Sequence, residues 1–121
     1  TFLLASLSSH AEWVFYSQNI KGWKYWYDKS RVSIVDDIAV AWVRNKFGDS
    51  TEGDYKSSQA RVKINCQSQS YLFLSQTDFS DNSWVGVIWH SNKPTKAKFI
   101  PPHTAIHDLA QIVCRKPSLI I

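Results

Sequence analysis

Glycine is scarce in this sequence, with four residues among 121. Loops that wrap around nucleotide phosphates need closely spaced glycines, and neither G-x-G-x-x-G nor G-x-x-x-x-G-K-[ST] occurs. Long hydrophobic runs are also missing, and none approaches the roughly 20 residues of a membrane-spanning helix. These absences exclude the common phosphate-binding loops and predict that the chain has no integral membrane segment.

Charge of one sign is not concentrated anywhere along the chain. Fourteen Lys and Arg against ten Asp and Glu give a net charge of +4, which is only weak support for an anionic partner. A length of 121 residues with 44% hydrophobic residues is enough to form one folded domain with its own core. We therefore expect a single domain.

Cysteine is limited to Cys66 and Cys114, and no C-x-x-C pair is present. This excludes the usual zinc ribbons and thioredoxin-like motifs. In a cytosolic protein the two residues would be buried thiols, whereas in an exported protein they would form one disulfide.

The N-terminal residues favour export. Residues 2–7 are mostly apolar, like the end of the hydrophobic region of a signal peptide, and Ser9-His10-Ala11 fits a small-x-small cleavage site. The alternative is an ordinary N-terminal strand or helix. We predict that residues 1–11 are a signal-peptide remnant, that residues 12–121 are the domain, and that it is located in the periplasm or at the cell surface with Cys66 bonded to Cys114.

Alternation of apolar and polar residues is clearest in residues 58–66. Ala60, Val62, Ile64 and Cys66 alternate with polar side chains, so that these four face the same side of a strand. Shorter apolar or aromatic runs predict further strands, and a polar, acidic loop is predicted for residues 48–56. The other predicted strands are residues 13–16, 23–27, 32–35, 38–47, 71–76 and 84–89.

One helix is predicted near the C-terminus. Pro101 and Pro102 end the strand region, because proline cannot donate to a sheet, and Thr104 is a suitable N-cap. Apolar residues up to Val113 and Cys114 then recur on one helical face. The fold class predicted is α+β: an antiparallel sheet of about six strands with one C-terminal helix packed on it and tied to it by the disulfide.

Several short segments occur in a fixed order along the chain: Trp13, Trp26-Tyr27-Asp28, Val40-Ala41-Trp42-Val43, Val62-Lys63-Ile64-Asn65-Cys66, Phe99-Ile100-Pro101-Pro102 and Leu109 to Cys114. In this order they resemble the surface-adhesin protein E family of bacterial exported proteins over about residues 12–115. The resemblance implies the same sheet, helix and cysteine pair, a location outside the cytoplasm, and binding of a protein ligand such as host extracellular matrix.

Catalytic and metal-binding patterns are weak. His103 and His107 have a helical i, i+4 spacing, but His103 precedes the expected N-cap and no H-E-x-x-H is present. No G-x-S-x-G elbow occurs, and a disulfide would occupy both cysteines. We predict no enzyme activity, no metal and no cofactor.

Aromatic residues make up 14% of the chain and offer a binding surface. Their alternative role is packing in the core. Where they lie on a sheet face that the helix does not cover, they would form an exposed patch rimmed by cations. The candidate ligand-binding residues are Trp23, Tyr25, Arg61 and Lys63, with Lys24 as a rim residue because it points to the opposite side of its strand from Trp23 and Tyr25.

The sequence therefore predicts a non-enzymatic exported protein that binds a protein ligand. The alternative is a periplasmic structural module that forms a homodimer through a sheet edge or face. Nucleic acid is not an expected partner, because export argues against it and no RNP-type motif occurs.

Overall fold

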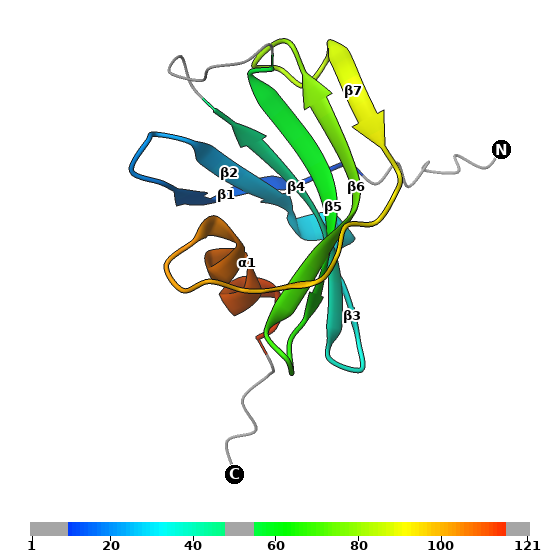
Figure 1. Ribbon diagram of the computed structural model, residues 1–121. Coiled ribbons are helices and arrows are strands. Elements are labelled where there is room, and N and C mark those ends of the chain that lie inside the picture. Colours follow the sequence, from blue (N-terminus) through cyan, green and yellow to red (C-terminus); the bar gives the residue numbers. More distant parts are fainter. Residues whose placement is uncertain (1–9, 48–54, 116–121) are drawn as a thin grey trace, which may run out of the picture.

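A computed structural model describes residues 10–47 and 55–115. Within them the chain forms one antiparallel sheet of eight strands and one α-helix, which lies against one side of the sheet (Figure 1). The elements are β1 (Trp13–Gln18), β2 (Lys24–Asp28), the 3-10 turn η1 (Lys29–Arg31), β3 (Ser33–Val35), β4 (Ile38–Lys46), β5 (Ser57–Asn65), β6 (Ser70–Phe79), β7 (Val87–Ser91), β8 (Lys98–Phe99) and α1 (Ala105–Val113).

The sheet follows the order of the chain. Its main path is β1-β2-β4-β5-β6-β7, while β3 pairs with β4 and β8 pairs with β6. The tightest connection joins β3 to β4 through Asp36 and Asp37, which both have positive φ angles, 50° and 64°. Asp tolerates this conformation better than most residues, and two such residues suit the twist of a two-residue hairpin.

The core lies between α1 and the middle of the sheet. Ala39 and Ala41 on β4 and Val62 and Ile64 on β5 are buried there, opposite α1 residues Leu109, Ala110 and Val113. Residues at every second position of β4 and β5 point to this side, as the alternation in the sequence predicts. The small alanine side chains leave room for the helix close to the strands.

Both ends of α1 are fixed. Thr104 is the N-cap, and its hydroxyl accepts a hydrogen bond from the amide of His107 at 3.3 Å. The Ser17 hydroxyl of β1 donates to Asp108 at 2.6 Å, which ties the first strand to the helix. The helix ends at Val113, and Cys114 follows as its C-cap.

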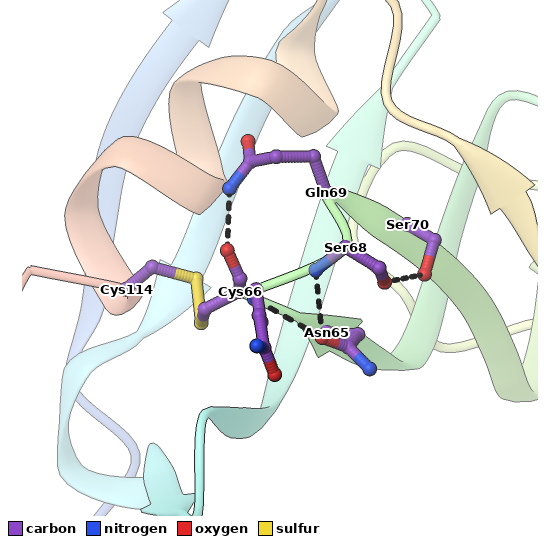
Figure 2. Close-up of a disulfide and its surroundings, with 7 residues drawn as sticks. Asn65, Cys66, Ser68, Gln69, Ser70 and Cys114 are labelled. Carbon is purple, nitrogen blue, oxygen red and sulfur yellow. Dashed lines mark hydrogen bonds between the residues drawn. A yellow bond between two sulfur atoms is a disulfide. The ribbon is translucent and has the colours of Figure 1, made fainter.

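The Cys66–Cys114 disulfide is present, as predicted, and joins the C-terminal end of α1 to the residue after β5 (Figure 2). The two Cα atoms are 5.6 Å apart, which is ordinary for a disulfide. The adjoining β5–β6 turn is held by Asn65, whose side chain accepts hydrogen bonds from the amides of Gln67 and Ser68, and by Gln69, which donates to the Cys66 carbonyl.

Asp28, at the end of β2, is the buried charged residue that organises the N-terminal strands. Its carboxylate accepts hydrogen bonds from the amide of Glu12 and from the amide and hydroxyl of Ser30, and lies 3.6 Å from Nε of Arg31. Burial by itself would raise the pKa of Asp28, but these donors and the guanidinium together hold it below its ordinary value.

The predicted fold class is confirmed, with differences in detail. β7 begins at Val87 instead of residue 84, β6 extends to Phe79, and the two-residue strand β8 carried no sequence signal. Residues 1–9 of the predicted signal remnant and residues 48–54 of the predicted loop lie outside the described residues. In the part of the chain that is described, no helix has the length and apolar character needed to cross a bilayer.

A basic and aromatic sheet face as the candidate functional site

The sheet has a second face, which points away from α1. The strand register places cations and tryptophans side by side on it: Lys24 lies opposite Lys46, Trp26 opposite Arg44, and Trp42 opposite Arg61. Because side chains alternate along strands, these residues share one side of the sheet. We call this surface the open face; it comprises Lys24, Trp26, Trp42, Arg44, Lys46, Arg61 and Lys63.

Tryptophan rings pack around two of these cations. The Arg44 guanidinium lies 4.3 Å from the ring centre of Trp13 and 4.7 Å from that of Trp84. The Lys46 ammonium lies 4.9 Å from the Trp84 ring and 5.5 Å from the Trp26 ring. These are cation–π distances, and we call Trp13, Trp26, Trp84, Arg44 and Lys46 the tryptophan cluster.

Trp84 reaches the cluster from the β6–β7 loop, not from a strand. Its indole N–H lies within hydrogen-bond distance of the carbonyl oxygens of Asn45 at 3.2 Å and Ser58 at 3.1 Å. Its backbone has a φ of +56°, which is unusual for a large side chain. The carboxylate of Asp81 stabilises the loop by accepting bonds from following backbone amides, including that of Gly86 at 2.8 Å.

Arg44 is the most constrained cation of the open face. Its Nε donates to the side-chain oxygen of Gln59 on β5 at 2.7 Å. Burial lowers the pKa of the Arg44 guanidinium, and the negative charge of Asp28 partly opposes that shift. An arginine stays charged at neutral pH all the same, so the cluster holds a fixed positive charge between aromatic rings.

The remaining cations of the open face are exposed. Lys24, Arg61 and Lys63 all point into solvent, and within residues 10–47 and 55–115 none forms an ion pair with a carboxylate. Asp28 follows Lys24 and Trp26 on the same side of β2, but its side chain is buried beneath this surface. This side of the sheet is therefore suited to contact a surface that carries negative charge and aromatic or apolar groups.

The five predicted ligand-binding residues are divided between the two sides of the sheet. Lys24, Arg61 and Lys63 lie on the open face. Tyr25 lies on the side covered by α1, where its ring is 6.2 Å from that of Tyr16, and burial raises its pKa. Trp23 precedes β2 and packs edge-on against Phe47 at 4.8 Å. The structure does not bring Trp23 and Tyr25 together with the three cations.

Sequence reasoning did not single out the tryptophan cluster. A usable signal was present. Lys24 and Trp26 are two residues apart on β2, as are Arg44 and Lys46 on β4, so each pair shares one side of its strand. Pairing of the two strands then places all four residues on the same side of the sheet. Trp84 had no such signal, since it lies in an irregular loop and its hydrogen-bond acceptors are 39 and 26 residues away.

The histidine pair lies at the start of the helix. The rings of His103 and His107 are 6.4 Å apart, and His103 precedes α1 with a φ of +61°. Among the described residues, no three metal-ligating side chains come together.

Comparison with known families and structures gives a consistent result. The family model described as Surface-adhesin protein E matches residues 13–115, while no curated protein matches the chain. Crystal form II of Haemophilus influenzae protein E is similar at a TM-score of 0.59 and 14% identity, covering 87% of this chain and 88% of that one. A second structure of Haemophilus influenzae protein E is similar at a TM-score of 0.57 and 14% identity, and the match covers 87% of this chain and 85% of that chain.

The structure of protein E from non-typeable Haemophilus influenzae gives a TM-score of 0.55 at 13% identity, with 87% of this chain and 76% of that chain covered. At such low identity, the structural matches support a shared fold alone.

Proposed function

Because the chain belongs to the surface-adhesin protein E family, we propose that it is a non-enzymatic binding protein that acts outside the cytoplasm and contacts a protein ligand, such as a host extracellular-matrix protein. The observation that carries this proposal is the open face, where five cations and two tryptophans share one side of the sheet, and the acidic residue on that side of β2, Asp28, is buried.

The residue types of the open face are those that dominate binding energy at protein interfaces. Tryptophan and arginine are enriched at such positions, because they supply large contact areas and directed hydrogen bonds. The ring stacking around Arg44 and Lys46 fixes their side chains before a ligand arrives, which lowers the entropic cost of binding. Lys24, Arg61 and Lys63 then attract an acidic ligand surface and speed its association.

We further propose that residues 12–121 are the mature domain and that residues 1–11 are the remnant of a signal peptide. N-terminal sequencing of the protein recovered from an exporting bacterial host tests this. A mature start near Glu12 supports the proposal, and retention of residues 1–11 after export contradicts it.

The ligand proposal is tested by measuring binding of the folded domain to a panel of purified extracellular-matrix proteins. The variant Lys24→Ala/Arg61→Ala/Lys63→Ala should bind the same matrix protein about tenfold more weakly, equivalent to about 1.4 kcal/mol. The matched control is Lys93→Ala/Lys96→Ala/Lys98→Ala, which removes three exposed charges, two from the segment between β7 and β8 and one from the first residue of β8.

The control should bind like the wild type. Equal weakening in both variants would mean that binding depends on the net charge of the protein and not on the open face, which would contradict the proposal. Failure to bind any of the matrix proteins would refute the proposed ligand class.

A second candidate function is self-assembly into a homodimer, which the outer edge of β7 favours. In the described residues no strand pairs with this edge, and Val87, Ile88 and Trp89 on β7 are 59%, 49% and 48% exposed. An unpaired edge with apolar side chains is a template for pairing with a second chain. Sedimentation equilibrium should show a dimer that Val87→Lys dissociates; a monomer at all concentrations contradicts this function.

A further inference from the structure

A cavity of about 290 Å³ lies between the start of α1 and the strands. It is on the side of the sheet that carries α1, so an inference about it does not depend on the function proposed for the open face. Its lining comes from β1, β2, the three central strands and the helix. The residues used below are Tyr16, Tyr25, Phe73, Gln76, Asp78 and Ile106.

Most of the cavity wall is aromatic or aliphatic. Tyr16 and Tyr25 stand next to each other with ring centres 6.2 Å apart, Phe73 on β6 contributes another ring, and Ile106 closes the wall from α1. Such a wall accepts the apolar part of a ligand or a cation over the ring faces. The volume is near the lower limit of small-molecule pockets, roughly 300 Å³, so the ligand must be small.

One part of the wall is polar and carries a negative charge. Asp78 and Gln76 of β6 both line the cavity. No hydrogen bond or ion pair of the Asp78 carboxylate is found within the described residues, while other half-buried acids such as Asp108 do have a donor. Burial raises the pKa of Asp78. Arg44 also lines the cavity, but its guanidinium group contacts the rings of Trp13 and Trp84 and the side chain of Gln59. The Asp78 carboxylate is only partly buried, so it is available to pair with a ligand that brings a cation into the cavity.

We propose that this cavity binds a small primary amine with a single ring, whose ammonium group pairs with Asp78 and whose ring packs between Tyr16, Tyr25 and Phe73. The ammonium group supplies three donors, which match the carboxylate of Asp78 and the side-chain oxygen of Gln76. An anionic ligand is disfavoured by the same carboxylate, and a neutral ligand leaves it without a partner.

The test uses three probes that share a benzene ring and a short chain: 2-phenylethylamine, 2-phenylethanol and 3-phenylpropanoate. Titration of the isotope-labelled chain, followed by NMR, should show 2-phenylethylamine shifting the backbone amides of Phe73, Asp78 and Ile106. The alcohol should bind about tenfold more weakly and the carboxylate more weakly still.

Two variants show whether Asp78 selects the amine. Asp78→Asn keeps the size of the side chain and removes its charge, and should abolish the preference for the amine over the alcohol. Asp36→Asn makes the same change in the exposed β3–β4 turn and should leave that preference intact. The inference is overturned if the amine shifts no cavity residue, if all three probes bind alike, or if Asp78→Asn keeps the preference.

Discussion

The Cys66–Cys114 disulfide should carry a large share of the stability of this domain. The two residues are 48 positions apart, and the chain-entropy model gives about 4 kcal/mol for closing a loop of that length in the unfolded chain. A domain of this size is stable by about 5–15 kcal/mol in total. Replacing both cysteines by serine should therefore lower the free energy of unfolding by about 4 kcal/mol.

The assay is urea denaturation at pH 7 of the oxidised wild type and of Cys66→Ser/Cys114→Ser, followed by circular dichroism. In a thermal melt of the same two proteins, at about 4 °C per kcal/mol for a domain of this size, the melting temperature should fall by about 15 °C. A reducing agent should destabilise the wild type to the same extent and leave the double variant unchanged. A loss below about 1 kcal/mol, or two alkylatable thiols in the native exported protein, would refute the reasoning.

Three further predictions concern single residues. Leu109→Ala should lower the free energy of unfolding by about 2–5 kcal/mol in a denaturant titration, because Leu109 is fully buried between α1 and the sheet. The pKa of Asp28 is held below its ordinary value in the folded state, so its stabilising effect should be present above about pH 4 and lost as the pH falls further. Asp28→Asn should flatten that pH dependence in urea titrations between pH 7 and pH 3. Trp84→Phe should cost about 1–2 kcal/mol in thermal unfolding, because the indole N–H then no longer bonds to the carbonyls of Asn45 and Ser58.

Much of the fold could be predicted because its signals are local. The alternation of Ala60, Val62 and Ile64 reports which side of β5 is buried, whatever lies next to it. Thr104 begins α1 through a bond to an amide three residues away. The strand β8 gave no signal, because two residues are too few to show a period.

The candidate site was harder to predict because it depends on pairing between strands. The sequence shows that Lys24 and Tyr25 point to opposite sides, but it does not show which side α1 covers. That side is set by the buried contacts of Leu109 and Val113 with the sheet. The predicted patch therefore combined side chains from both sides, and Tyr25 turned out to line the cavity beside α1.

The central claim is that the open face contacts the ligand, and hydroxyl-radical footprinting of the complex with a bound matrix protein tests it most directly. The oxidation of each tryptophan shows whether the ligand covers the part of the surface where that residue lies. Trp26 and Trp84 belong to the tryptophan cluster, whereas Trp23 packs on Phe47 and Trp89 lies on edge strand β7. The predicted result is that the ligand protects Trp26 and Trp84 from oxidation and leaves Trp23 and Trp89 unchanged. Protection of Trp23 or Trp89 with no change at Trp26 and Trp84 would contradict the claim.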